Sequence, residues 1–438
     1  MNAIRYLRDG YRWLRDPYRF LDRALLRHGL TFRARLPVLG DALMTGDHRL
    51  LEEIVHHKDL DGGKAVTGLR AIFGSRSLIM LEGEAHAARR RLIAPSFRGE
   101  GLAAYDELTA RVTREVLRSL PYGRTFSMYG MLRRIGLKAM IAAMFGDGSA
   151  IAEHAEAVVE RFLNSFGNPL ILFFRPLRVD AGPWSPWGRA LRNRRALCDL
   201  IRGQIQLRTK APRGDTILGR LVADASGCTS LNEEDLIQEV LSLLLFGHDT
   251  AAATMAWAFA HIYQQRGLVQ QLRDEVEAAN ADPPDPEALP LLKACIQESM
   301  RLCPVVVHLG RAATADLRLG DYTVRRGQRV IPCTYLAQHN PAIFSEPYMF
   351  RPQRFLHGER YEHAYFPFGF GSRTCVGKPF AMRQMLLVLA TALRSVDLQL
   401  APGYVPEPAR HLVLIVPRGG TLMQRQQMPS AIPLRVGC

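Results

Sequence analysis

One cysteine of this chain lies among residues that suit the binding of a metal held in a flat macrocycle. Cys375 belongs to residues 366–377, which are rich in phenylalanine and glycine, and it comes just before a helical pattern. A thiolate at a helix N-terminus is stabilised by free backbone N–H groups and the helix dipole. Glycines let a flat group approach the backbone, and Arg373 could bind a carboxylate at its edge. The alternative is a buried cysteine in a glycine-rich turn.

An acid and an alcohol stand side by side in a second candidate segment. Asp249 and Thr250 belong to residues 241–260, which are apolar nearly all round and so favour a buried helix. Buried polar groups need partners or a function, because burying them unpaired costs free energy. One interpretation is a local opening of the helix that relays protons, with Asp249 as the general acid. The other is that Thr250 bonds back to the preceding turn and bends the helix.

Charged residues at helical spacing form a third candidate set. Glu298 and Arg301 are three residues apart and therefore share one face of the helix expected there. Alone, such a pair is an ordinary surface ion pair worth a few tenths of a kcal/mol. Arg354 follows in residues 350–355, which read Phe-Arg-Pro-Gln-Arg-Phe.

The elements that must position these residues are mainly helices. The longest run is free of proline and contains Gly247 as its one notable glycine, and Ser230 to Glu233 read as a capping box in front of it. Pro304 ends a second helix, and a third follows Cys375. The expected spans are 234–265, 289–303 and 376–396.

The remaining segments predict short strands and turns. Strands and turns are expected over 317–332, and a terminal hairpin is expected over 398–424, with 412–416 as one strand. Residues 339–370 read as an ordered irregular segment. The fold class is therefore mainly α with small β-sheets (α+β). We expect one domain over 1–438, with an N-terminal extension over 1–30 and a flexible tail over 425–438.

Composition excludes several classes of protein. With 438 residues of which 47% are hydrophobic, the chain is too apolar to be disordered. Its seven cysteines include no C-x-x-C pair, so neither a disulfide framework nor a zinc site is indicated. No stretch reaches the roughly 18 apolar residues of a membrane-spanning helix, and the N-terminus lacks the apolar core of a secretory signal. We expect a cytoplasmic protein without a membrane span.

The net charge of +15 has three interpretations. Nucleic-acid binding is not favoured, because lysine and arginine are scattered along the chain. A solvated basic surface is the simplest interpretation. Attraction of an acidic protein partner is the third.

The cysteine segment resembles the haem-ligand loop of the cytochrome P-450 superfamily, whose pattern is Phe-x-x-Gly-x-Arg-x-Cys-x-Gly. The matching residues are Phe368, Gly371, Arg373, Cys375 and Gly377. The resemblance implies a cytochrome P-450 fold in which Cys375 is the proximal thiolate of haem b and lies across the haem from the long central helix. Phe368, Gly369 and Gly377 would contact the cofactor. Thiolate donation favours cleavage of the O–O bond.

Residues 350–355 resemble the Phe-x-Pro-x-Arg-Phe segment of the same family. The order of the charged residues along the chain also matches. The resemblance implies a structural triad that holds the ligand loop from behind the haem: Glu298, Arg301 and Arg354.

Residues 246–250 resemble the Ala/Gly-Gly-x-Asp/Glu-Thr element of the family. The resemblance favours the relay interpretation, in which Asp249 feeds protons to the distal side of the haem and Thr250 steadies the oxygen that reacts there. Phe246 departs from the pattern, because the family usually has Ala or Gly at this place. Its ring either narrows the space over the iron or packs outward.

Basic residues elsewhere match the positions that bind haem propionates. His86 and Arg90 resemble the family's Trp/His-x-x-x-Arg element, and Arg311 lies in the strand after Pro304. With Arg373 they form the expected propionate set. Arginine suits the task, because it binds carboxylates in a forked geometry and stays charged.

By the same resemblance, the substrate pocket draws on mostly apolar residues. The segment 66–79 contributes Phe73, and the other expected residues are Phe246, Ala251, Val305, Val307 and Leu414. An apolar lining favours an apolar substrate, although such residues are equally consistent with the protein core.

The resemblance implies a monomeric haem-dependent monooxygenase of the soluble bacterial type. It would insert one atom of dioxygen into an apolar small molecule such as a terpenoid, steroid, fatty acid or other secondary metabolite. Electrons would come from an acidic ferredoxin or flavodoxin with its NAD(P)H reductase, attracted by Lys378 and Arg383 on a basic face. No nucleic acid is expected as a partner. One alternative is a haem-thiolate peroxygenase or rearrangement enzyme of the same fold, and another is a haem sensor or electron carrier without turnover.

Overall fold

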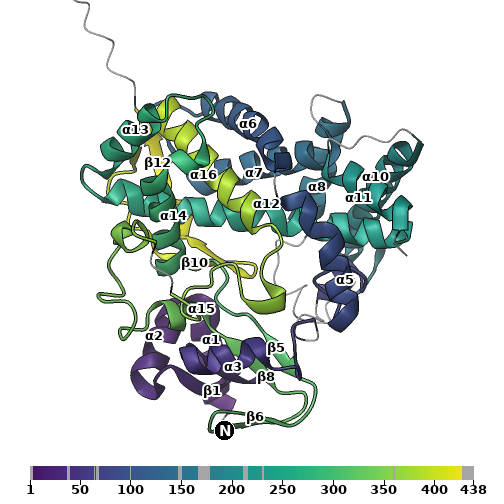
Figure 1. Cartoon of the computed structure of the whole chain (residues 1–438), viewed down its shortest axis with the longest axis vertical. Coiled ribbons are helices and arrows are strands. Elements are labelled where there is room, and N and C mark those ends of the chain that lie inside the picture. The colour runs from purple at the N-terminus through teal and green to yellow at the C-terminus, as the bar shows by residue number, and fades with distance from the viewer. Residues whose placement is uncertain are drawn as a thin grey trace, which may run out of the picture.

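The long helix α12 (Glu233–Gln264) crosses the middle of the molecule in the computed structural model (Figure 1). The structure describes residues 3–36, 40–63, 65, 69–98, 100–146, 150–165, 178–210, 216–228, 231–358 and 361–426. Most side chains of α12 are buried, as expected of a helix that is apolar on all sides. Its span confirms the predicted helix over 234–265.

The start of α12 differs from the prediction. The N-cap is Asn232, whose side-chain oxygen accepts a hydrogen bond from the Asp235 N–H at 2.9 Å. The Asp235 carboxylate in turn accepts from the Asn232 N–H at 3.1 Å. The predicted capping box over residues 230–233 is therefore wrong, and Ser230 lies outside the described residues. An Asn–Asp pair makes the same reciprocal bonds two residues later.

Helices from both halves of the chain surround α12 and form a helical body. It packs against α7 (Met128–Phe145), α14 (Pro290–Leu302) and α16 (Lys378–Ser395). The last two confirm the helices predicted over 289–303 and 376–396. Two apolar clusters fill the space between these helices. The other long helices of the body are α5 (Gly83–Ile93), α6 (Asp106–Arg118), α8 (Ala150–Asn164), α10 (Pro186–Lys210), α11 (Ile217–Cys228) and α13 (Leu268–Ala278).

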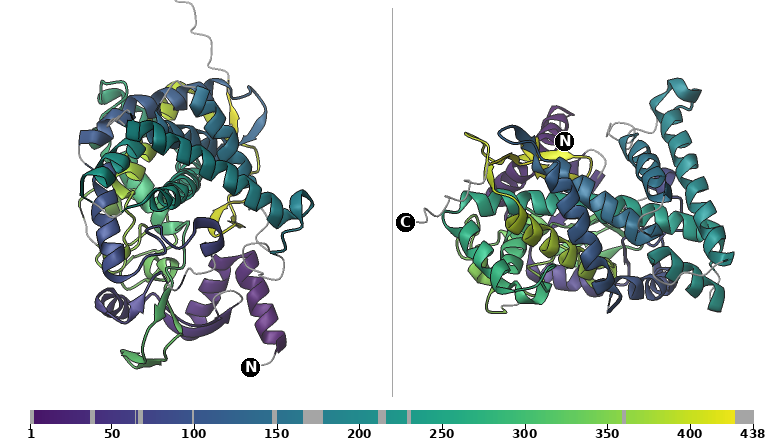
Figure 2. Two further views of the ribbon diagram at one scale, coloured as in Figure 1. Left: turned by 90° about the vertical axis from the view of Figure 1, so that its right-hand side faces the viewer. Right: turned by 90° about the horizontal axis from the view of Figure 1, so that it is seen from above.

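A five-stranded sheet lies at the other end of the molecule (Figure 1). Its strand order is β1 (Thr31–Leu36), β2 (Gly40–Thr45), β8 (Arg329–Pro332), β5 (Arg311–Ala313) and β3 (Leu60–Asp61). The β2–β8 pair is parallel and the other pairs are antiparallel. A third apolar cluster joins this sheet to the N-terminal helices α1 (Ala3–Arg15) and α2 (Pro17–His28). The segment predicted as an N-terminal extension therefore consists of α1 and α2, purple in Figure 2, and both helices pack against the rest of the molecule through this cluster.

Three smaller sheets complete the described structure. They are β6 (Leu317–Leu319) with β7 (Tyr322–Val324), β10 (Pro408–His411) with β11 (Leu414–Pro417), and β4 (Thr125–Ser127) with β12 (Leu422–Arg425) and β9 (Leu398–Leu400). The predicted mixture of many helices with small sheets is confirmed.

The turn between β10 and β11 falls inside the strand predicted over 412–416. Leu412 has a φ of 54°, in the left-handed region that strands do not adopt, and Val413 is exposed. The prediction of a strand over 412–416 is therefore wrong at its start, because the first two of these residues form the turn.

Short helical elements and the C-terminal residues make up the rest of the described structure. Two helices are short: α4 (Arg70–Phe73) and α15 (Thr334–Gln338). A 3₁₀ turn covers Pro352–Phe355 within the segment predicted to be irregular. The Gln426 N–H donates to the Asp397 carbonyl at 2.9 Å, so the expected tail is still tied to the sheet at this residue. Residues 427–438 lie outside the described part. No helix in the described ranges is long and apolar enough to cross a membrane.

Candidate functional site

The Cys375 loop is held by its own backbone hydrogen bonds. The Cys375 N–H donates to the Phe368 carbonyl at 2.8 Å, and the Gly369 N–H donates to the Phe366 carbonyl at 2.9 Å. Gly369 has a φ of 73°, a conformation that side-chain-bearing residues rarely adopt. The chain then enters α16, with Gly377 at its N-cap. The expected cysteine before a helix is therefore present.

The surroundings of the Cys375 thiol have opposing effects on its pKa. Burial among neighbouring atoms is the largest effect and raises the pKa of the Cys375 thiol. The backbone N–H groups of Gly377 and Lys378 and the nearby Arg90 act in the opposite direction. The residue is nevertheless exposed to solvent. Both observations agree if the thiol lies on the floor of a hollow that is open on one side. A metal ion there would deprotonate it.

Basic side chains converge next to this loop. Nη1 of Arg90 donates to the carbonyl oxygen of Thr374 at 2.6 Å, one residue before Cys375. Burial, together with the charges of the neighbouring Arg373 and Arg90, lowers the pKa of His86 to about 4. His86 is therefore neutral at pH 7.

The arginines of this cluster carry incompletely compensated charge. Burial lowers the pKa of Arg90, Arg311 and Arg373, that of Arg311 to about 10. Nη2 of Arg373 lies 3.4 Å from the carboxylate of Asp61 and also donates to the Leu81 carbonyl. A lowered pKa means that the site disfavours the charged form, so an added anion would be stabilised there.

One face in the middle of α12 is partly exposed, although most of the helix is buried. Leu243, Phe246, Gly247 and Thr250 are partly exposed, and their spacing of three and four residues places them on one stripe. These four residues form the open stripe of α12. The rings of Phe246 and Phe73 pack at 4.9 Å between centroids, and Phe73 is fully buried.

Asp249 is held by residues from outside its own helix. Its Oδ1 accepts from the Tyr129 hydroxyl at 2.6 Å and lies 3.0 Å from Nε of Arg133, both on α7. Its Oδ2 lies 3.9 Å from Nε2 of His411 on β10. Burial raises the pKa of Tyr129, so this hydroxyl stays protonated and donates. Burial lowers the pKa of His411, and Asp249 partly opposes that shift.

The helix around Thr250 is continuous. The Thr250 hydroxyl donates to the Phe246 carbonyl at 2.9 Å, and α12 remains helical throughout this segment. The local opening included in the relay interpretation is therefore absent, and the back-bonding that competes with it is present.

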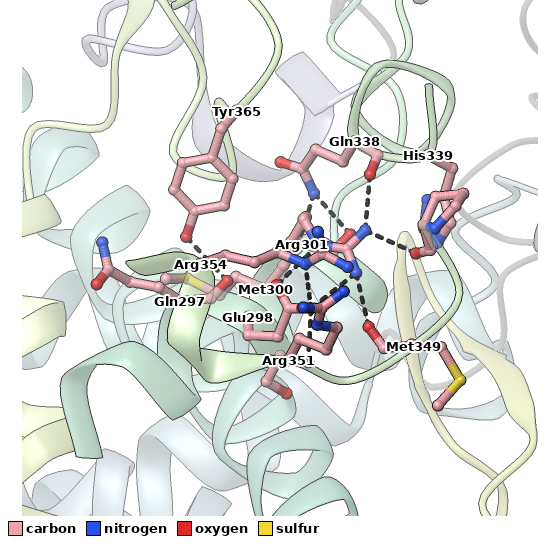
Figure 3. Close-up of polar contacts among 12 residues, drawn as sticks. Gln297, Glu298, Met300, Arg301, Gln338, His339, Met349, Arg351, Arg354 and Tyr365 are labelled. Atoms are coloured by element: carbon pink, nitrogen blue, oxygen red, sulfur yellow. Dashed lines mark hydrogen bonds and ion pairs between the residues drawn. The ribbon is translucent and has the colours of Figure 1, made fainter. Parts of the chain in front are cut away.

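The three charged residues of the predicted triad are brought together (Figure 3). Nε and Nη2 of Arg301 each donate to Glu298 at 2.8 Å, and both side chains are fully buried. Nε of Arg354 lies 3.3 Å from the same carboxylate. Arg301 also donates to the carbonyls of Gln338 and Pro347 at 2.8 and 2.7 Å. The triad thus ties α14 to the irregular segment that leads to the loop.

A model of the family described as Cytochrome P-450 matches residues 38–423 of this chain. The chain belongs to the cytochrome P-450 family. It is thus an oxidoreductase, a haem monooxygenase that uses haem b, binds a substrate and dioxygen, and takes electrons from a redox partner.

Relatives and solved structures agree with the family. Proteins of Mycobacterium tuberculosis provisionally named cytochrome P-450 138 and 137 are each 28% identical; the first match covers 93% of this chain and 91% of that protein, and the second covers 96% and 86%. The retinoic acid-bound structure of cyanobacterial CYP120A1 has a TM-score of 0.83 at 20% identity over 96% of both chains. The structure of CYP102L1 has a TM-score of 0.76 at 20% identity over 94% of this chain and 98% of that one. At these identities the structures show the fold.

The residues of this P-450 fit haem b. The solvent-open Cys375 thiol could bind an iron, and the buried guanidinium groups beside it could bind two propionates. Glycine at position 369 keeps Cβ atoms away from the loop surface, and the Phe368 ring is partly buried beside it. The open stripe of α12 would lie against the distal side of the haem. Haem b, when bound, supplies the iron at which dioxygen is activated.

The six expected pocket residues do not form one cluster. Phe246 and Val305 are partly exposed, whereas Phe73, Ala251 and Leu414 are buried. Val307 is 1% exposed and packs in the core cluster with Trp13 and Ile331. This cluster joins the sheet to α1 and α2, and the role of Val307 in the pocket stays a prediction.

No sequence pattern indicated several of the residues that contact the predicted ones. Tyr129, Arg133 and His411 hold Asp249 but lie on other elements, far from it in the chain. Asp61, which contacts Arg373, was also missed. None of these residues stands in a spacing pattern with its partner, so the tertiary structure was needed to find them.

Proposed function

We propose that Cys375 is the axial thiolate ligand of the haem iron and that the basic cluster binds the propionates. The observation that carries this proposal is the bond from Arg90 to the Thr374 carbonyl, which joins the cluster to the cysteine loop. The four residues of the cluster are His86, Arg90, Arg311 and Arg373. Phe368, Gly369 and Gly377 would lie against the proximal face of the haem.

Replacement of the ligand tests this assignment. Reduced wild-type protein with carbon monoxide should show the long-wavelength absorption that a thiolate ligand causes, and Cys375→Ser should lose it. Cys198→Ala, at a buried cysteine of the helical body, should keep it. A Cys375→Ser protein that retained the absorption would overturn the assignment.

Asp249 and Thr250 are proposed to deliver protons to the distal side. Tyr129 and Arg133 hold the Asp249 carboxylate on the side of α12 that packs against α7. The side chains of Arg133 and His411 are 31% and 35% exposed, so water reaches this side. The Asp249 carboxyl group would take a proton from this water, and its rotation away from Tyr129 would carry the proton to the open stripe. There the Thr250 hydroxyl could turn from the Phe246 carbonyl to donate or accept.

The substrate is proposed to be an apolar small molecule, such as a terpenoid, steroid or fatty acid. Support comes from the apolar surfaces of Phe246 and Val305, which are accessible, and from Phe73 behind them. A library of apolar natural products should be titrated into the haem-loaded protein while the haem absorption is recorded. Compounds that shift the spectrum should then be incubated with electron donor and dioxygen, with products identified by mass spectrometry.

An acidic ferredoxin or flavodoxin is the proposed electron donor. A hollow of about 480 Å³ opens beside the Cys375 loop, and Arg90, Arg91 and Arg98 are among its lining residues. Lys378 is exposed next to it. The expectation that Arg383 is free is wrong, because its Nε donates to Asp106 at 2.6 Å. The hollow is therefore a better candidate for the docking surface. Because such donors are fed by NAD(P)H reductases, we place the enzyme in the cytoplasm.

Salt dependence tests the docking surface. Reduction by an acidic ferredoxin should slow as ionic strength rises, since charge attraction speeds association. Arg98→Glu should slow reduction at low salt by roughly tenfold, whereas Arg266→Glu on the helical body should not. A reduction rate that changes neither with ionic strength nor in Arg98→Glu would contradict an acidic partner at this surface.

The same haem-loaded protein distinguishes the monooxygenase from the alternative functions. Product formed with peroxide, but none with electron donor and dioxygen, would identify a peroxygenase. A spectral response without any product would identify a sensor or carrier. The intact hydrogen bonds of Asp249 favour the monooxygenase, because that reaction consumes delivered protons.

A further inference from the structure

A hollow of about 520 Å³ lies along α1 and α2, and none of its lining residues belongs to the cysteine loop. Arginines dominate the lining. They are Arg8, Arg12, Arg15, Arg19, Arg23 and Arg418. Those of each helix repeat at three or four residues and therefore share one face. Two consecutive helices thus present basic faces to the same space.

The positive charge of this surface is only partly neutralised. Of the lining carboxylates, Asp16 pairs with Arg19 at 3.3 Å, and Glu407 pairs with Arg418 at 3.1 Å. Arg8 lies 3.6 Å from Asp9 on its own helix. Within the described ranges, no carboxylate pairs with the remaining three, Arg12, Arg15 and Arg23. An anion would therefore be attracted to this surface.

Large apolar side chains are exposed on the same two helices. Tyr11 is 61% exposed and lines the hollow, and Leu14 is 42% exposed. Leu26 is 87% exposed, one helical turn after Arg23. A soluble anion makes no use of exposed leucines. Arginines interspersed with leucine and tyrosine on a helix surface are typical of helices that lie in a membrane interface.

The opposite faces of α1 and α2 are anchored firmly on the body. Trp13 is 5% exposed, and the Arg410 guanidinium stacks on its ring at 4.5 Å. The Tyr18 hydroxyl donates to the Pro304 carbonyl at 3.2 Å. Figure 1 shows both helices at the end of the molecule that carries the sheet, near β10. The basic surface is therefore a fixed platform.

We propose that this platform, the exposed faces of α1 and α2 together with Arg418, docks the enzyme on a bilayer that contains anionic phospholipid. The arginines would bind lipid phosphates, and Tyr11, Leu14 and Leu26 would enter the headgroup region. The charge and the exposed apolar residues together carry the inference. It does not depend on the roles proposed for the haem-site residues.

Vesicle co-sedimentation of the full-length, haem-loaded protein tests the proposal. One set of vesicles contains phosphatidylglycerol in phosphatidylcholine, and the other contains phosphatidylcholine alone. Binding is expected to the anionic vesicles, with a loss as salt is raised, and not to the neutral ones. Equal binding to both sets would overturn the proposal.

Variants locate the surface. Arg12→Gln/Arg15→Gln/Arg23→Gln should weaken binding roughly a hundredfold, since each basic residue near an anionic membrane contributes about fivefold. Leu26→Gln should weaken it by about tenfold through lost apolar contact. The matched control Arg124→Gln/Arg195→Gln/Arg266→Gln removes the same charge from exposed sites on the helical body. It should bind almost as the wild type does.

Two further measurements complete the test. Thermal unfolding and the carbon monoxide spectrum should be unchanged in every variant, because the altered side chains lie on the surface. An equal loss of binding in the control would show that net charge alone acts, and it would overturn the platform. Calorimetry with inorganic pyrophosphate tests whether the surface binds a soluble anion instead of a membrane. Tight pyrophosphate binding without vesicle binding would also overturn the proposal.

Discussion

The hydroxyl of Tyr129 donates to the carboxylate of Asp249 over 2.6 Å, from a helix that is remote in sequence. This bond fixes the acid on the side of α12 that packs against α7, while Thr250 lies on the open stripe. Proton delivery by Asp249 therefore requires the carboxylate to leave a strong hydrogen bond.

Asp249→Asn should lower turnover by about a hundredfold, which is the lower range for loss of a general acid. Asn keeps the shape and can still accept from Tyr129, so haem content and the carbon monoxide spectrum should not change. Product formation and the solvent hydrogen isotope effect measure the result. Turnover near that of the wild type would remove Asp249 from the relay.

Tyr129→Phe should have a different effect from loss of the acid itself. The variant removes one donor to a charged group, an interaction worth about 1.5–3 kcal/mol, while Arg133 stays at 3.0 Å. Orientation of the carboxylate becomes looser, so turnover should change by about tenfold or less. The matched control is Tyr263→Phe, a tyrosine on α12 whose hydroxyl is buried without a bond to Asp249. A hundredfold loss in Tyr129→Phe would show that the hydroxyl itself moves protons.

Phe246→Ala should widen the distal space. The Phe246 ring packs at 4.9 Å against Phe73 and covers part of the open stripe. Its removal should let bulkier apolar ligands shift the haem spectrum, at a stability cost of about 1–3 kcal/mol for a partly buried ring. Dissociation constants for a homologous series of ligands measure the change. If ligand size preference is the same in both proteins, the ring does not limit the pocket.

Glu298→Gln should destabilise the fold and reduce haem retention. It leaves Arg301, which is fully buried, without its carboxylate, and breaking such a pair costs about 3–5 kcal/mol. Urea unfolding and the haem-to-protein ratio measure both effects. Asp199→Asn, in the exposed i,i+3 pair with Arg202, is the control and should change stability by less than about 0.5 kcal/mol. A small effect of Glu298→Gln would mean that the triad does not hold the loop.

The long helices and the motif residues were predictable from the sequence for definite reasons. The span of α12 follows from an unbroken apolar run, and Glu298 and Arg301 share a face through helical spacing. The start of α12 was misplaced, because several polar residues before it could cap and only the backbone selects Asn232. The turn at Leu412 was missed because an apolar run carries no mark for a positive φ.

Contacts between distant elements were not predictable. Nothing near Asp249 in the chain indicates Tyr129 or His411, and apolar type alone could not tell core from pocket for Val307. Such placements depend on how whole elements pack, which a single sequence does not encode as a local pattern.

Acid should destabilise this protein through its buried histidines. Burial lowers the pKa of His308 and His339 to about 3 and that of His261 to about 4, below the ordinary value of 6.5. The unfolded chain therefore takes up these protons first as pH falls. Stability should be fully present above about pH 6.5 and should be lost progressively towards pH 4 and below, by several kcal/mol in total. Glu239 opposes this trend, because burial raises its pKa and the folded protein takes up that proton first.

His308→Gln should make this loss shallower by about one proton. The Trp13 indole N–H donates to Nε2 of His308 at 3.3 Å, a bond that the protonated ring cannot accept but that glutamine keeps at every pH. Urea unfolding between pH 4 and 7 gives the free energy of unfolding, and its slope against pH counts the protons. His48→Gln, at an exposed histidine on α3 (His48–His56), should leave the slope unchanged. If His308→Gln has the slope of the wild type, His308 does not contribute to acid sensitivity.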